Sequence, residues 1–157
     1  MFSRFCRCLI VACGVLFPAS ASAQLQAAGD LAQLAAAARA QRVPVLIAFM
    51  QQSCPYCKVA RRDYLVPLQN DPRWRGRVLI REVDVDRGAR MHDFDGNATT
   101  HRDFARKHGV RRVPTVMVFD AGGKAVAPPI IGLLTEDFYR LYIEQAIEAG
   151  LLAMRRR

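Results

Sequence analysis

The chain has 157 residues, of which 52% are hydrophobic and 24% charged, which is the composition of a globular protein of one domain. Its net charge is +9, but the basic residues are dispersed and do not alternate with aromatic ones, so we expect no binding to nucleic acid. A solvated basic surface accounts for the charge, and the arginines at 155–157 are typical of a frayed tail.

The N-terminus has the three parts of a secretory signal peptide: a basic start, an apolar stretch and the small residues Ala21-Ser22-Ala23 at a cleavage site. A retained membrane anchor is an alternative, but the apolar stretch is interrupted by Pro18 and is shorter than the ~20 residues that span a bilayer. A lipoprotein cleavage site at Cys13 is a second alternative. We therefore expect residues 1–23 to be a signal peptide and residues 24–157 to form one domain in the periplasm, where disulfides can form.

The exported part begins with the pattern of a helix followed by a buried strand. Asp30 is suited to cap a helix in which apolar residues recur at helical spacing as far as Ala40. Residues 45–50 are apolar without interruption, which is typical of a central parallel strand buried on both faces. Pro55 then stands in the first turn of a second helix.

The end of this second helix is marked by Pro67 and Pro72, and Trp74 can pack the following turn onto the core. Residues 78–85 are rich in β-branched side chains and predict the next strand. The polar stretch 86–97 contains glycines and predicts a loop or small hairpin added to the fold.

A short helix and a hairpin are predicted next. Thr100 and Asp103 resemble a capping pair, and Gly109 supplies a helix stop. A strand over 115–119 is followed by a glycine-rich turn and a returning strand at 125–126, which together predict the hairpin.

An amphipathic stretch from Thr135 to about Gly150 predicts the last helix. The early strands are separated by helices, so they need right-handed crossovers and form a parallel pair, whereas the last two strands are antiparallel. The sequence therefore predicts an α/β fold with both kinds of strand pairing.

Cys54 and Cys57 are the only cysteines outside the expected signal peptide, and they lie where the buried strand gives way to the helix. Two cysteines three residues apart at a helix start are one turn apart on the same face, which is close enough for a disulfide. Free backbone N–H groups and the helix dipole favour a thiolate at the first position, so Cys54 is the predicted nucleophile. Cys57 would resolve the mixed disulfide, in a reaction that needs no cofactor.

A static disulfide and a zinc site are the alternative interpretations of the pair. A structural zinc ion needs four ligands, no second cysteine pair is left, and His92, His101 and His108 lack metal-site spacing. A disulfide across so short a loop adds little stability. We therefore expect a redox pair without a metal.

Two motifs give a family resemblance: Ser53-Cys54-Pro55-Tyr56-Cys57-Lys58 after a buried strand, and Val113-Pro114-Thr115 before a later one. Together they resemble the thioredoxin superfamily. From about Val45 to Ala149 the chain is most similar to the SoxW-type periplasmic thioredoxins, which group with the disulfide isomerase catalytic domains, and the insert at 93–96 is part of that similarity. The resemblance implies a thioredoxin-like fold, with a central mixed sheet flanked by helices, an N-terminal helix and a small insertion before the helix that precedes Pro114.

The resemblance also implies roles for individual residues. Pro114 would be a cis-proline that faces the cysteines, with an ordinary trans proline as the alternative, and the backbone of Val113 would pair with an extended substrate. Pro55, Tyr56 and Lys58 would support the active site, Lys58 either by its positive potential or only as a solvated lysine. The Pro-Tyr pair also matches the glutaredoxins, which makes glutathione a second candidate substrate.

One position departs from the family pattern. Thioredoxins carry a buried acid six residues before the first cysteine, and this chain has Ala48 there. Glu82, on the strand after the active-site helix, is the candidate substitute near Cys57, and a surface carboxylate is the alternative.

We therefore expect a periplasmic thiol:disulfide oxidoreductase that acts on the thiols and disulfides of partner proteins, as a reductant supplied by a membrane electron donor. We expect a monomer, because the related isomerases use an added dimerisation domain. The alternative is a thioredoxin-like binding or metal-delivery module without redox turnover. Reduction potentials of pairs with this spacing range from about −270 to −120 mV, so the motif alone does not choose between reductase, oxidase and isomerase.

Overall fold

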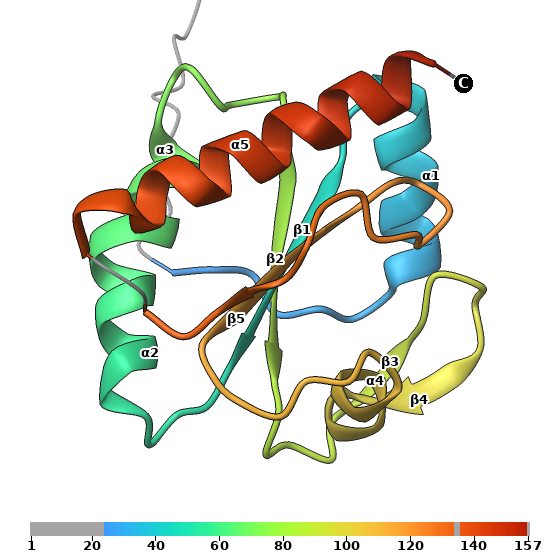
Figure 1. Ribbon diagram of the computed structural model, residues 1–157. Helices are drawn as coiled ribbons and strands as arrows, with labels where there is room; N and C mark the ends of the chain where they lie inside the picture. Colours follow the sequence, from blue (N-terminus) through green and yellow to red (C-terminus); the bar gives the residue numbers. More distant parts are fainter. Residues whose placement is uncertain (1–23, 134–135, 157) are drawn as a thin grey trace, which may run out of the picture.

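The computed structural model describes residues 24–133 and 136–156, which form a four-stranded sheet covered by helices and a smaller two-stranded sheet (Figure 1). The expected signal peptide, residues 1–23, lies outside the described residues. The elements in chain order are α1 (Leu31–Gln41), β1 (Val45–Met50), α2 (Pro55–Val59), the π-helix η1 (Ala60–Leu65), α3 (Val66–Asn70), β2 (Leu79–Asp84), β3 (Arg90–His92), β4 (Ala98–Thr100), α4 (His101–Lys107), β5 (Thr115–Phe119), β6 (Ile130–Ile131) and α5 (Glu136–Arg155). Among the described helices, none combines the length and the apolar character needed to cross a membrane.

The central sheet is mixed, as the sequence predicts, and its strand order is β2-β1-β5-β6. β1 pairs in parallel with β2 and antiparallel with β5, and β5 pairs antiparallel with β6. Every residue of β1 is buried, which explains its uninterrupted apolar run. The predicted α/β class, with a central mixed sheet flanked by helices, is thereby confirmed.

The two faces of β1 contribute to two separate cores, because successive side chains of a strand point to opposite faces. Leu46, Ala48 and Met50 belong to the core that also contains side chains of α2, η1, α3 and α5. The alternate residues of β1 pack with side chains of α1 and α4. The active-site helix and the C-terminal helix therefore share one core.

Several local predictions are confirmed. Asp30 caps α1 by accepting a hydrogen bond from the N–H of Gln33 at 2.8 Å, and Thr100 caps α4 by accepting one from Asp103 at 3.1 Å. Trp74 is 6% exposed and belongs to the core. The polar stretch before α4 forms a hairpin, in which β3 and β4 pair antiparallel.

The active-site helix runs through Pro67 and ends just before Pro72, so only the second of the two predicted prolines marks its end. It continues through the π-helix η1 and through α3 to Asn70. Proline has no N–H to donate and its ring crowds the carbonyl four residues earlier, here that of Asp63. The wider π-helical turns directly before Pro67 accommodate both effects, so the helix passes through the proline.

The last helix also runs past its predicted end near Gly150. It continues to Arg155, so this residue belongs to the helix rather than to a frayed tail. A Cβ at position 150 would lie 2.6 Å from the Cβ of Pro44 and 3.1 Å from the Cγ1 of Val118. The glycine is therefore explained by the close packing of α5 on the sheet rather than by a helix stop.

The hairpin after β5 is less regular than predicted. The turn at Asp120 forms, and its carboxylate accepts two backbone N–H groups at 2.8 and 3.0 Å. Residues 125–126 do not form a strand, because only a single bridge joins Ala125 to Phe119. Pro128 and Pro129 interrupt the pairing since they have no N–H, and β6 completes it beyond them.

Candidate active site

Cys54 is the N-cap residue of α2, where β1 gives way to the helix at the lower left of Figure 1. Its backbone is extended, with φ −79° and ψ 117°, and its Sγ accepts a hydrogen bond from the N–H of Cys57 at 3.2 Å. Pro55 follows in the first turn, where its missing N–H removes no helical hydrogen bond. The sulfur therefore faces the free N–H groups of the helix start.

The two sulfurs differ in access to solvent. Cys54 is half-buried, whereas Cys57 is 0% exposed, and both are free thiols. Burial, together with the hydrogen bond to Cys54, raises the pKa of the Cys57 thiol to about 12, against the opposing effects of a Gln51 backbone contact and the positive charge of Arg61. A partner can thus reach the first sulfur, while the second is held as a thiol behind it.

The segment before β5 lies against the first cysteine. The Cys54 thiol makes a weak contact with the backbone carbonyl oxygen of Val113, at 3.9 Å, and the Val113–Pro114 peptide bond is cis. Pro114 is buried and Val113 is half-buried. Two motifs that are far apart in the sequence therefore meet at one site.

Glu82 is a buried, paired carboxylate rather than a surface one. Its α-carbon is in register with that of Ala48 on the neighbouring strand, and the residue is 9% exposed. The Arg61 guanidinium donates two hydrogen bonds to this carboxylate: Nε lies 2.8 Å from one oxygen and Nη2 lies 2.7 Å from the other. Glu82 is thereby linked to the cysteine pair through Arg61, whose charge acts on Cys57.

A cavity of about 340 Å³ adjoins this ion pair and reaches Gln52 in the loop before Cys54. Arg61, Glu82, Asp84 and His101 are among its lining residues. The Nδ1 of His101 accepts the N–H of Asp84 at 3.0 Å, and its Nε2 lies 2.7 Å from the carbonyl oxygen of Ala28. In the described part of the chain, no group of three or more His, Cys, Asp or Glu side chains is arranged to hold a metal ion.

Tyr56 and Lys58 lie at the outer surface of the site. Tyr56 is 64% exposed and Lys58 is also exposed. Among the side chains that the structure describes, neither makes a hydrogen bond or an ion pair. Both therefore lie at the surface next to the cysteine pair, and their supporting role stays a prediction.

Sequence reasoning missed Arg61 and Tyr139. Arg61 follows Cys57 by four residues on one continuous helix, a spacing that could have placed it beside the buried sulfur. Tyr139 on α5 is fully buried, its hydroxyl has no hydrogen-bond partner among the described residues, and burial together with the charge of Cys57 raises its pKa. Its ring contacts that of Tyr64 edge-on, with centroids 5.0 Å apart, and no local pattern in the sequence indicates this contact.

The sequence matches one protein family, described as thioredoxin-like domain, over residues 31–147. That match covers more than half of the chain and includes both cysteines and the segment before β5. A comparison with curated protein sequences gives no match.

Solved structures share the fold at low sequence identity. Thioredoxin O2 from Arabidopsis thaliana in its oxidised state is 20% identical, with 80% of this chain and 96% of that chain covered and a TM-score of 0.54. Mitochondrial thioredoxin 3 from Saccharomyces cerevisiae, also oxidised, is 19% identical, with coverage of 79% and 93% and a TM-score of 0.52. A thioredoxin-fold protein from Helicobacter pylori is 16% identical, with coverage of 71% and 73% and a TM-score of 0.54. At such identities the similarity establishes the fold.

Proposed function

Because this chain belongs to the thioredoxin-like family, we propose that it is a thiol:disulfide oxidoreductase that exchanges disulfides with partner proteins. The observation that carries the proposal is a reachable sulfur at a helix start with a buried free thiol one turn behind it. Disulfide exchange requires both properties, because the first sulfur must meet a partner and the second must meet only the first.

The proposed reaction begins with the thiolate of Cys54, a form that helix starts stabilise. It attacks one sulfur of a partner disulfide, a Cys54–partner disulfide forms, and the other partner sulfur leaves as a thiolate that takes up a proton. Cys57 then loses its proton and attacks the Sγ of Cys54, which releases the second partner sulfur. The partner disulfide is reduced to two thiols, and the two electrons come from the Cys54 and Cys57 thiols, which become a disulfide.

The ionisation of Cys57 needs assistance, because burial raises its pKa to about 12. The strand position that holds an acid in thioredoxins is Ala48 here, so another group must act. We assign this role to Arg61, whose positive charge favours the Cys57 thiolate. Glu82 is the positioning residue: its two carboxylate oxygens accept hydrogen bonds from the Arg61 guanidinium at 2.7 and 2.8 Å.

The partner would bind beside Cys54, on the segment that precedes β5. Val113 would pair its backbone with an extended partner strand, and its carbonyl already lies 3.9 Å from the Cys54 sulfur. Pro55, Tyr56 and Pro114 would border that strand. The exposed ring of Tyr56 offers it an apolar surface.

We place the reaction in the periplasm, with the protein acting as a monomeric reductant that a membrane donor supplies with electrons. The pattern of residues 1–23 supports export, and disulfides are substrates only where they can form. A reduction potential near the low end of the range from about −270 to −120 mV would support the reducing direction, and one near the high end would indicate a disulfide donor.

The test is the reduction of insulin with dithiothreitol as the electron source. The wild-type protein and the control Ser53→Ala should accelerate the reaction, and Cys54→Ser should not. Equal rates for Cys54→Ser and the wild type would refute the proposal. Copper or zinc retained at one equivalent through gel filtration, together with no thiol exchange, would instead favour the binding or metal-delivery module.

A further inference from the structure

Two adjacent arginines, Arg111 and Arg112, directly precede the segment that contacts Cys54. Both are exposed, and neither guanidinium makes a hydrogen bond or an ion pair within the described residues. Some other arginines are held by carboxylates, as Arg61 is by Glu82 and Arg140 is by Glu144 at 2.8 Å. The charges of Arg111 and Arg112 are therefore available to a binding partner.

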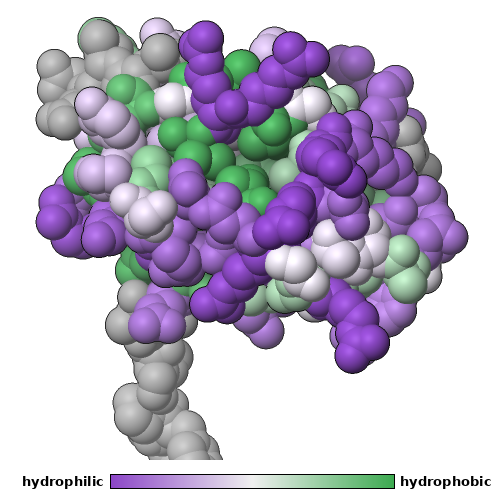
Figure 2. Space-filling model, turned by 90° about the horizontal axis from the view of Figure 1, so that it is seen from below, coloured by the Kyte–Doolittle hydropathy of each residue, from purple (hydrophilic) through white to green (hydrophobic). Residues whose placement is uncertain are grey.

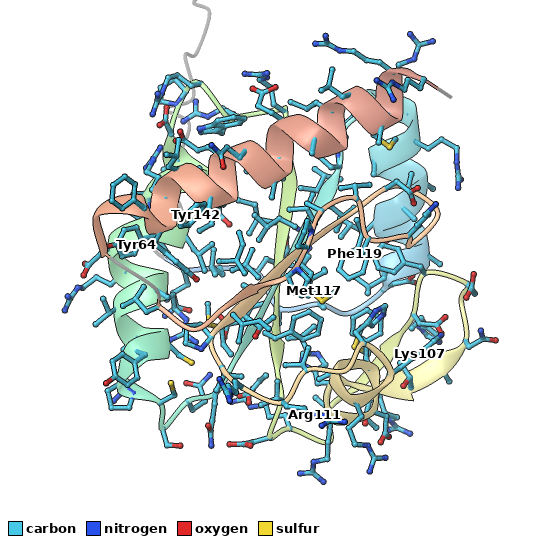
Figure 3. All side chains as sticks on the ribbon, viewed as in Figure 1. Tyr64, Lys107, Arg111, Met117, Phe119 and Tyr142 are labelled. Atoms are coloured by element: carbon cyan, nitrogen blue, oxygen red, sulfur yellow. The ribbon has the colours of Figure 1, made fainter. Side chains whose placement is uncertain are left out.

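These arginines lie close to the reacting sulfur. The Val113 carbonyl is 3.9 Å from the Cys54 Sγ, and consecutive α-carbons are ~3.8 Å apart, so both arginine α-carbons lie within ~8 Å of that of Val113. Figure 3 shows Arg111 at the lower end of the molecule, the end at which α2 begins. The backbone that carries both arginines is therefore continuous with the segment that contacts Cys54.

The surface beside the arginines combines apolar and cationic groups. A cavity of about 220 Å³ is lined by Val110, Arg111, Arg112, Met117, Pro129 and Ile131, among others, and none of its lining residues is acidic. Figure 2 looks onto this lower end of the molecule and shows a hydrophobic centre surrounded by hydrophilic side chains. Such a surface suits a partner segment that has apolar side chains and carries negative charge.

The register of a bound strand would place the partner's charges over the arginines. Residues of an extended strand advance ~3.3 Å each, so the residues within three positions of the partner cysteine span ~10 Å on either side. If that strand pairs with Val113 while its cysteine meets Cys54, one flank of the cysteine lies along Arg111 and Arg112. Carboxylates on this flank would face two unpaired guanidinium groups.

We propose that the preferred substrates of this protein are disulfides whose cysteine is flanked by acidic residues, which Arg111 and Arg112 recognise beside Cys54. The inference rests on the proposed redox function and adds to it a class of substrate. The chemical step is unchanged: the partner disulfide is reduced and the Cys54–Cys57 disulfide forms. The arginines act by raising the rate at which an acidic segment meets Cys54.

Three matched peptides test the proposal, each with a single cysteine in a mixed disulfide with 2-mercaptoethanol. They differ only in the residues within three positions of the cysteine, which are Glu, Gln or Lys. Flanking charges alter the intrinsic reactivity of a disulfide, so each rate with the reduced full-length protein is divided by the rate with dithiothreitol. The corrected rates should fall in the order Glu, Gln, Lys, with about a tenfold difference between Glu and Lys at low salt that shrinks at high salt.

The variant Arg111→Gln/Arg112→Gln should bring the ratio of the Glu rate to the Lys rate close to one. The matched control Arg75→Gln/Arg156→Gln removes two exposed arginines from the turn after α3 and from the end of α5, at the opposite end of Figure 1, and should keep the ratio. Equal corrected rates for the Glu and Lys peptides, or a preference that survives in Arg111→Gln/Arg112→Gln, would overturn the inference while leaving the redox function intact. Failure of all three peptides to react would overturn the redox function itself, and this inference with it.

Discussion

The substitution Arg61→Met should slow the second half of the reaction, in which Cys57 displaces the partner. Four residues of helix span ~6 Å, and a unit charge at that distance contributes up to ~3 kcal/mol at an effective dielectric constant of ~20. The bond between Arg61 and Glu82 offsets part of this contribution. If about half of the ~3 kcal/mol remains, Arg61 lowers the pKa of Cys57 by about one unit, since one pKa unit corresponds to about 1.4 kcal/mol. Without Arg61, the thiolate of Cys57 would then be about tenfold less abundant.

Stability and rate can be separated with a second variant. Arg61→Met leaves Glu82 buried without its partner, and breaking a buried pair costs about 3 kcal/mol of unfolding free energy. The double variant Arg61→Met/Glu82→Leu removes both charges and should regain most of this stability, but it should not regain the rate. Urea denaturation measures the unfolding free energy of each variant.

Stopped-flow mixing with an aromatic disulfide that releases a coloured thiol measures the rate. The first release of colour reports capture by Cys54, and the second reports displacement by Cys57. Arg62→Met is the matched control. Arg62 is the next residue in the helix, its side chain is exposed, and among the described residues it pairs only with Asp63. A second phase as fast in Arg61→Met as in Arg62→Met would refute the role of Arg61.

Four further outcomes are expected. Because the pKa of Cys57 is raised from 9.0 to about 12, the second phase should continue to accelerate about tenfold per pH unit above pH 9, where the rate of a thiol with an unshifted pKa would level off. The same shift should lower the stability of the reduced protein as the pH rises above about 9, because the Cys57 thiol then ionises in the unfolded chain but not in the folded one. A Cys57→Ala variant with the same pH dependence of stability would show that Cys57 is not the cause. Gly150→Ala should lower the unfolding free energy by about 1–3 kcal/mol through its clash with Pro44, whereas Gly29→Ala, which meets no atom within 4 Å, should change it little in the same denaturation assay. Tyr139→Phe removes a buried hydroxyl that has no hydrogen-bond partner among the described residues, and it should stabilise the protein by about 1 kcal/mol in thermal unfolding. A loss of stability would show that this hydroxyl does make a hydrogen bond in the folded protein.

Elements with strong local signals could be predicted from the sequence. The unbroken apolar run of β1 indicated a strand buried on both faces, and the position of Cys54 directly before Pro55 indicated the helix start. Asp30 and Thr100 identified two helix caps through their own side chains. In each case the residues that form the feature are neighbours in the chain.

Features that depend on distant residues could not be predicted. The run of the helix through Pro67 requires the π-helical turns before it, and the close approach of Gly150 to Pro44 depends on how α5 docks. The bond between Arg61 and Glu82 joins a helix to a strand through the register of the sheet. The similarity to SoxW-type proteins and the export signal stay predictions from the sequence.

The account depends on unequal access to two sulfurs, and selective alkylation measures that access directly. The reduced protein is treated with less than one equivalent of iodoacetamide at neutral pH, and the labelled cysteine is identified by peptide mass spectrometry. The account predicts that the label is found on Cys54, with Cys57 modified only after unfolding. Equal labelling of both cysteines in the folded protein, or an unreactive Cys54, would contradict it.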